Sequence, residues 1–319
     1  MSENSYIYAV ARIRTKEMQL LNASFLEQLL AAPDEAQCLR LLQERGWGSG
    51  SAEEVLTQEH QKTWDLIAEL VGDMSVFDVF LYQNDYHNLK AAVKEACTAG
   101  KHPGIYMQQG TVPYTRIQKA VEGRNFSLLP ERMRVVAEKA MNTLLHTRDG
   151  QLCDCIIDKA ALEAIEQAGK DSKEELLALY GELVVVTADI KTAVRAQKTG
   201  KDRAFLERSL ASCDTLDIVA LTDAALTGFS AICSYLEKTP YAEAVPELKV
   251  SAAAFERWCD NLLIHRIHPQ LHNPFGIGPL AAYILARESE IKTVRIILSG
   301  KRNDLSEASI RERVRETYV

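Results

Sequence analysis

The chain has 319 residues and a formal net charge of −7, with 47% hydrophobic and 25% charged residues, as in a folded globular protein rather than a disordered one. Alanine and leucine, 38 and 37 in number, dominate the composition, whereas only 16 glycines and 9 prolines are present. This bias predicts an α-helical protein and argues against a turn-rich sandwich, barrel or propeller. The acidic excess also argues against a nucleic-acid partner, which would require a basic surface.

Start and stop signals for helices recur along the chain. Gly46 follows a helical stretch and predicts a stop. Ser51 and Glu54 have the spacing of a capping box, in which each side chain bonds the other residue's backbone N–H, and Ser172 and Glu175 predict a second one. Apolar residues recur with the 3.6-residue period of a helix face over 131–147, 155–168, 174–198, 215–236, 249–266 and 276–298.

The run Leu183–Val186 is rich in β-branched residues and by propensity resembles a strand. Helical patterns lie on both sides of it within 174–198. We therefore predict that this run is a fully buried turn of a helix.

Three segments repeat one pattern, an amphipathic helix with a basic end followed by Gly-Lys. Gly100, Gly200 and Gly300 are the predicted helix stops, and Val194 of the second segment coincides with Val294 of the third without a gap. The first segment aligns after one deletion. The repeated segments are residues 85–101, 188–201 and 289–301.

The repeat predicts an all-α fold of three similar helical lobes, each with a long helix and an arm of shorter helices. The alternative is an irregular helical bundle with accidental spacing. The arms are expected at residues 25–48, 112–133 and 225–245, and the lobes at residues 1–105, 106–210 and 211–319.

Little in the sequence suggests catalysis or a resident metal. His265, His268 and His272 are close enough in sequence to suggest a zinc site, but Pro269 interrupts the shared helix face before the last of them. A proline-rich loop with solvated or capping histidines is the interpretation that we favour. The Gly-Ile-Gly at 276–278 matches only part of a phosphate-binding loop, since no strand precedes it and Pro279 removes a donor.

No window contains the ~18 apolar residues of a membrane span, and the start of the chain does not resemble a signal peptide. We therefore expect no direct insertion into a membrane. The seven cysteines are scattered and odd in number, as expected for free thiols in a reducing cytoplasm. Cys153 and Cys155 resemble half of a metal site, but no second pair lies at zinc-like spacing.

Three stretches together resemble one family. They are YAVARIRTKEMQLL near the start, NDYHNLKAAVK at 84–94, and the ending ARESEIKTVRIILSGKRNDLSEASIRERVRETYV at 286–319. These stretches are similar to the C subunit of the V-type (A-type) ATP synthases of bacteria and archaea, which is the family of the d subunit of the vacuolar ATPase. The resemblance extends from end to end, and the last 34 residues are its most specific part.

The resemblance implies a funnel of three similar lobes around a pseudo-threefold axis, in agreement with the repeat. It also implies a central-rotor spacer without catalytic residues or cofactor, which carries torque for ATP-coupled proton or sodium transport. Its partners would be the membrane proteolipid ring and the central shaft subunits. The expected location is the cytoplasmic face of the cell membrane, reached through the ATPase complex.

Two rival classes of function remain open. One is a helical enzyme with a site near His265–His272, which stoichiometric zinc would favour. The other is a helical adaptor protein unrelated to ion transport, which a free monomer that ignores proteolipid rings would favour.

Four basic residues at the repeat-equivalent helix ends are the candidate contacts with the ring. They are Lys101, Lys201, Lys301 and Arg302. The alternative is that these groups are solvated helix ends that the helix dipole favours. Polar loop ends of all three lobes are expected to touch the ring, with the shaft held in the central cavity.

Overall fold

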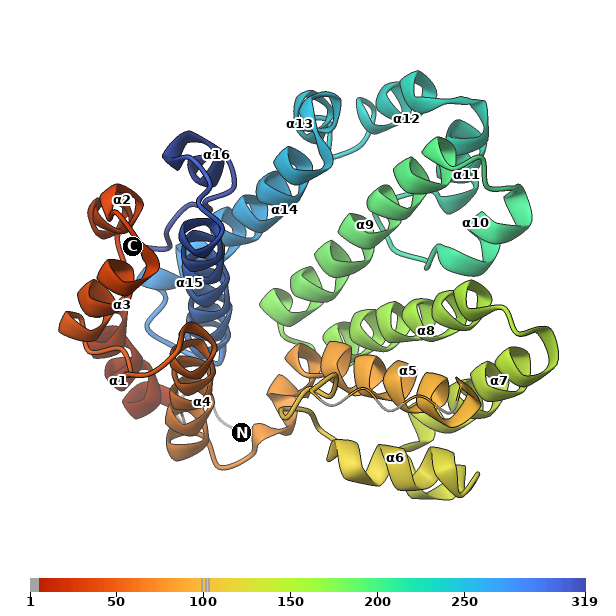
Figure 1. Ribbon diagram of the computed structural model, residues 1–319, viewed down its shortest axis with the longest axis horizontal. Coiled ribbons are helices and arrows are strands. Elements are labelled where there is room, and N and C mark those ends of the chain that lie inside the picture. Colours follow the sequence, from red (N-terminus) through yellow and green to blue (C-terminus); the bar gives the residue numbers. More distant parts are fainter. Residues whose placement is uncertain (1–5, 99, 101, 103) are drawn as a thin grey trace. The chain divides into compact units, whose positions relative to one another are not determined.

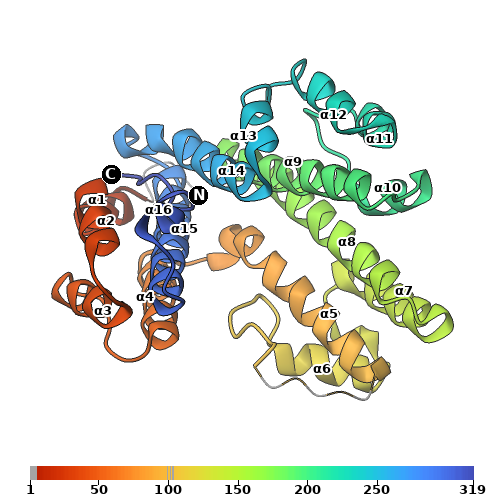
Figure 2. The same ribbon diagram turned by 45° about the horizontal axis from the view of Figure 1, so that its top comes forward.

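The computed structural model describes residues 6–98, 100, 102 and 104–319, and every regular element in that part of the chain is a helix. The predicted all-α class is confirmed. The chain folds into two compact units, the first made of Met1–Met74 and Glu243–Val319 and the second of Ser75–Ala242 (Figures 1 and 2). The three predicted lobes stay a prediction.

The first unit combines both ends of the chain. Its helices are α1 (Ile7–Glu17), α2 (Ala23–Ala31), α3 (Glu35–Glu44), α4 (Ala52–Leu70), α13 (Ala244–Val250), α14 (Ala252–Ile267), η4 (His268–His272), α15 (Gly278–Arg302) and α16 (Glu307–Arg311).

The second unit starts within η2 (Met74–Phe80). Its further helices are α5 (Tyr82–Thr98), α6 (Tyr114–Glu122), η3 (Phe126–Leu128), α7 (Glu131–Thr147), α8 (Gly150–Asp171), α9 (Glu175–Lys198), α10 (Arg203–Ser209), α11 (Ile218–Thr227) and α12 (Phe229–Leu236).

The capping box predicted at Ser51 and Glu54 is confirmed, whereas the one predicted at Ser172 and Glu175 is wrong. Ser51 accepts a bond from the Glu54 N–H and Glu54 bonds back, so α4 begins with a complete capping box. Ser172 instead ends α8, where its hydroxyl donates to the Gly169 carbonyl. The same hydroxyl accepts from the N–H of Glu174, the N-cap of α9, at 3.1 Å, so in this short turn Ser172 bonds both helix ends without forming the predicted box with Glu175.

The repeated Gly-Lys pairs end only some of the predicted helices. Gly200 has a φ of +63°, and the Lys201 N–H bonds the Ala196 carbonyl at 2.9 Å, so α9 stops there as predicted. The stop predicted at Gly300 is wrong, because α15 continues to Arg302. Gly300 serves packing instead, since a Cβ there would lie 2.5 Å from Ile310 Cγ1.

The core of the first unit forms where α15 packs against α2, α3, α4 and α16. Val294 and Ile297 are fully buried on its face. The helix buries most of its circumference, which explains why its sequence is apolar on nearly every side between Gly278 and Leu285.

The second unit is centred on the antiparallel pair α8 and α9, against which α5, α7, α10, α11 and α12 pack. The run Leu183–Val186 is helical, as predicted, and Leu183, Val185 and Val186 are buried, but Val184 is partly exposed, so the turn is not fully buried. Two glycines let the backbones of α8 and α9 approach closely near the turn. A Cβ on Gly169 would lie 2.5 Å from the Leu177 carbonyl oxygen, and one on Gly181 would lie 3.0 Å from the Ile165 carbonyl oxygen.

We expect Gly169→Ala to lower the free energy of unfolding by about 2 kcal/mol, because the added methyl group must push two backbones apart. Gly150→Ala is the matched control at the other end of α8, where a Cβ meets nothing within 4 Å. Urea unfolding followed by circular dichroism measures both. Equal stability of the two variants would contradict the close approach of α8 and α9.

Candidate functional site

A buried charge network joins α15 to α4 in the first unit. The Arg287 guanidinium donates to Glu59 Oε2 at 2.7 Å, forms an ion pair with Glu290 one turn along its own helix, and lies 5.3 Å from the Trp47 ring centroid. Arg287 is 6% exposed, and both carboxylates are buried. Lys62 also pairs with Glu59, at 2.6 Å, whereas Glu290 depends on Arg287, so removing the arginine would leave a buried carboxylate without its cation.

Glu290 also holds the beginning of the chain. Its Oε2 accepts a hydrogen bond of 2.5 Å from the N–H of Leu21, the residue before the N-cap of α2. Burial raises the pKa of Glu290, and the adjacent Arg287 acts in the opposite direction. A carboxyl group near the end of the chain thus fixes the entry of a helix near its start.

In the second unit, Asp85 likewise fixes the segment that enters a helix. This fully buried carboxylate of α5 accepts from the N–H of Val112, the residue before the N-cap of α6, and from the Thr111 hydroxyl. Arg132 of α7 forms an ion pair with it at 2.6 Å. Burial raises the pKa of Asp85, and these three donors oppose the rise.

A third buried carboxyl group has fewer partners. Asp189 of α9 is fully buried and accepts one bond, of 3.1 Å, from the Ala211 N–H at the start of the α10–α11 connection. Its second oxygen has no hydrogen-bond partner among the described residues. Burial therefore raises the pKa of Asp189 to about 7, although the Ala211 bond and the charge of Lys159 lower it.

Asn88 aligns with Asp189 in the internal repeat, because the alignment that matches Lys90 with Lys191 also matches these two positions. Asn88 is equally buried, and its amide both donates to and accepts from the backbone of Met107. Each of the two side chains thus accepts a hydrogen bond from a later connecting segment, one through a neutral amide and one through an ionisable group.

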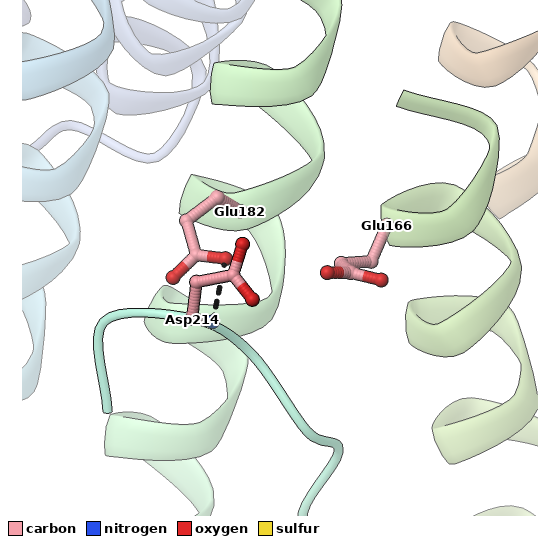
Figure 3. A group of neighbouring side chains, drawn as sticks. All are labelled: Glu166, Glu182 and Asp214. Carbon is pink, nitrogen blue, oxygen red and sulfur yellow. Dashed lines mark hydrogen bonds between the residues drawn. The ribbon is translucent and has the colours of Figure 1, made fainter. Parts of the chain in front are cut away.

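Three carboxylates gather between α8, α9 and the loop before α11. Figure 3 shows Glu166, Glu182 and Asp214, whose ligand atoms lie within 4.8 Å of one another. Glu182 accepts from the backbone N–H of Asp214, and Lys170 forms ion pairs with both Glu166 and Asp214, which raise the lysine's pKa. The lysine supplies the counter-charge, so the cluster fastens this loop to the helix pair.

The predicted ring contacts have different local environments. Lys301 donates to the Leu30 carbonyl at 2.6 Å, and Arg302 forms two hydrogen bonds with Glu35, of 2.9 and 2.5 Å. These bonds tie the end of α15 to α2 and α3. Lys201 donates to Gln151 Oε1 at 2.7 Å. Lys101 lies outside the described residues, so the four are not brought together on one described surface.

The histidines lie where α14 gives way to η4. His265 bonds Glu316 at 2.5 Å, and the ring of His268 meets the edge of Tyr318, with ring centroids 6.1 Å apart. His272 ends η4. Within the described ranges, the three are not among the side chains whose ligand atoms converge closely enough to share an ion.

The cysteines are thiols rather than disulfides, with Cys38, Cys153 and Cys233 buried. Burial raises the pKa of Cys38 and of Cys153 to about 11, so both thiols stay protonated at neutral pH. Cys153 and Cys155 face different surroundings, because Cys155 accepts a bond from the Ser209 hydroxyl.

The buried carboxyl groups were not identified from the sequence. Glu290, Asp85 and Asp189 lie inside repeat segments that were interpreted from their apolar and basic positions. The available signal was an acidic residue within an apolar helical stretch, as at Asp189, three positions after Val186. A carboxyl group on a buried face requires a partner, and this requirement predicts an anchor.

Comparison with known proteins identifies the class to which this fold belongs. The family profile described as ATP synthase (C/AC39) subunit matches residues 9–313. The chain therefore belongs to this family of subunits of V-type and A-type ATPases, as the resemblance predicted. Across the described residues, no helix is both long enough and apolar enough to cross a bilayer.

The individual relatives are similar over almost the whole chain. The C subunit of the V-type ATP synthase of Thermus thermophilus is 25% identical, and the alignment covers 98% of both chains. The C subunit of the V-type sodium ATPase of Enterococcus hirae is 21% identical over 96% of this chain and 97% of its own. The C subunit of the A-type ATP synthase of Methanocaldococcus jannaschii is 23% identical over 96% of this chain and 85% of its own.

We expect Arg287→Met to lower the free energy of unfolding by about 3–5 kcal/mol, because Glu290 would then be buried without a counter-charge and Glu59 would keep only its ion pair with Lys62. Arg295→Met is the matched control on the same helix, since its ion pair with Glu53 is exposed and contributes less than about 1 kcal/mol. Urea unfolding of both variants measures the difference. A similar small loss for both would show that the buried network does not stabilise the unit.

Asp189 predicts a pH dependence of stability. Because the folded-state pKa, about 7, exceeds the ordinary value of 3.8, the folded chain holds a proton that the unfolded chain releases. This contribution therefore lowers stability as pH rises from about 4 to about 7. Asp189→Asn keeps an acceptor for the Ala211 N–H without the charge.

As pH rises from about 4 to about 7, the free energy of unfolding of Asp189→Asn should therefore increase relative to that of the parent. The increase is at most about 1.4 kcal/mol per pH unit. Denaturant unfolding at several pH values measures it. Glu163→Gln, at an exposed position of α8, is the control that should show no such trend. A constant difference between pH 4 and 7 would refute the raised pKa.

Proposed function

We propose that this protein is a non-catalytic spacer subunit in the central rotor of a V-type or A-type ATPase. It joins the central shaft to the membrane proteolipid ring and transmits torque for ATP-coupled proton or sodium transport. The observation that carries the proposal is the match of the family profile to residues 9–313, together with relatives that align over nearly their whole length. The chain lies on the cytoplasmic side, peripheral to the membrane.

The connections between helices within each unit support a role in carrying torque. A subunit that carries torque must deform little, and closely packed helices supply that stiffness. Within the first unit, α15 is connected to α4 by the Arg287 network and to α3 by Arg302. Within the second unit, α5 is connected to α8 by ion pairs between Lys90 and Asp158 and between Lys94 and Asp154.

The proposal is tested with the rotary ATPase purified with and without this subunit. Without it, we expect the head to hydrolyse ATP while ion transport into vesicles is lost, because no connection remains between shaft and ring. Adding the purified chain should restore transport. Full coupling in its absence, or failure of the chain to bind isolated rings, would contradict the spacer proposal.

The basic helix ends remain our proposed ring contacts. Reversing Lys101 and Lys201 to Glu should weaken binding to isolated rings by about tenfold at low ionic strength, with the effect fading at higher salt. A binding assay on immobilised rings measures this. Lys198→Glu with Arg208→Glu changes the net charge equally at exposed positions and is the control.

Arg302 requires a separate design because it already pairs with Glu35. Exchanging the two residues, Arg302→Glu with Glu35→Arg, preserves the pair while moving the positive charge off α15. Weaker ring binding by this exchange variant, with unchanged helicity, is the expected result. Unaltered binding would remove Arg302 from the interface and leave the spacer proposal standing.

A further inference from the structure

A long cavity of about 650 Å³ lies within the second unit, between α8 and α9. The two helices are closest at the turn that joins them and diverge from it, and α10 packs against both (Figure 1). Residues of α5 and α10 complete the lining. The volume is in the range of cavities that hold small molecules.

The lining runs a considerable distance along both helices. On α8 it extends from Gln151 to Ile165, and on α9 from Val184 to Thr199. At 1.5 Å per residue, each span is about 20 Å long. Because the helices are antiparallel, Gln151 and Thr199 lie at one end of the cavity, and Ile165 and Val184 lie at the other.

The two ends differ in chemistry. Toward the α8–α9 turn, the two helices line the cavity with apolar residues, Ala161, Leu162, Ile165, Val184 and Ala188, while α5 adds Gln83, Tyr86 and His87. The five side chains of α8 and α9 offer an extended surface without a hydrogen-bonding group, which suits a hydrocarbon chain.

The other end carries an excess of positive charge. Asp158 and Asp154 line the cavity but pair with Lys90 and Lys94. Arg195 is exposed and, among the described residues, has no carboxylate partner.

Lys201 adds a second positive charge at the same end. Its contacts are the neutral Gln151 amide and the Phe205 ring, 5.3 Å away. Cations without a counter-charge are unexpected in a chain with a net charge of −7. They favour an anionic group, which an arginine fork binds with paired hydrogen bonds.

From this arrangement we propose that the cavity binds a single-chain amphiphile with an anionic head. The phosphate or carboxylate head lies between Arg195 and Lys201, and the hydrocarbon chain lies along the apolar end toward Val184. Fatty acids and lysophospholipids share this chemistry. The inference does not depend on the proposed function.

Titration calorimetry of the full chain with lysophosphatidylglycerol, kept below micelle formation, tests the proposal. We expect one molecule bound per chain, at least tenfold weaker binding of lysophosphatidylcholine, whose head has no net negative charge, and no measurable binding of inorganic phosphate. A comparison of the affinities of laurate and lysophosphatidylglycerol shows whether the preferred ligand is a fatty acid or a phospholipid. Equal affinity for the two lysolipids, or phosphate binding as tight as that of the amphiphile, would overturn the proposal.

Variants separate the two ends of the cavity. Arg195→Ala with Lys201→Ala should weaken lysophosphatidylglycerol at least tenfold, whereas Lys198→Ala with Arg208→Ala, which removes the same charge outside the lining, should leave the affinity unchanged. Val184→Asp places a negative charge in the apolar end and should weaken binding similarly. Circular dichroism checks the fold of each variant, and equal binding by all of them would refute the site.

Cys155 provides a readout of location, because it lines the cavity and is partly exposed. A saturating amphiphile should slow its alkylation by a maleimide at least fivefold. Cys259, which is partly exposed in the other unit, serves as the internal control and should react at an unchanged rate. Unchanged alkylation of Cys155 during saturation would place the ligand elsewhere and overturn the assignment.

Discussion

A buried side-chain oxygen that accepts a hydrogen bond from a loop N–H recurs in both units, and the path of the chain depends on it. Glu290 holds Leu21, Asp85 holds Val112, and Asp189 holds Ala211. In each case a long helix fixes the segment from which shorter helices continue. A polar group must give up water to reach such a position, so it stays only where a donor replaces that water.

The three anchors are stabilised to different degrees. Glu290 belongs to a network with Arg287, and Asp85 has Arg132 as a counter-charge, whereas Asp189 has one backbone donor and, within the described part of the chain, an unpaired second oxygen. Burial raises the pKa of each carboxyl group, and the partners of each act in the opposite direction. The raised pKa of Asp189 makes the α10–α11 connection sensitive to pH, and the neutral Asn88 shows a similar contact without an ionisable group.

The antiparallel pair α8 and α9 combines close packing at one end with a cavity along the rest of its length. Gly169 and Gly181 let α8 and α9 approach each other closely near their turn, and the helices then separate to leave the cavity that α5 and α10 line. Ion pairs such as Lys94–Asp154 connect the cavity wall to neighbouring helices. Close packing at one end thus supports the stiffness proposed for a rotor subunit, and the divergence supplies the proposed ligand cavity.

The sequence alone determined the helical class, the cap at Ser51, the helical turn at Leu183–Val186 and the family, because propensity, apolar period and end-to-end similarity are local or linear properties. It did not determine the continuation of α15 past Gly300, where Ile310 packs so closely that a Cβ would lie 2.5 Å from its Cγ1. Nor did it identify the partners of Glu290 and Asp189, or the cavity between α8 and α9. These features are decided by contacts between residues far apart in the chain, and local sequence patterns do not specify such contacts.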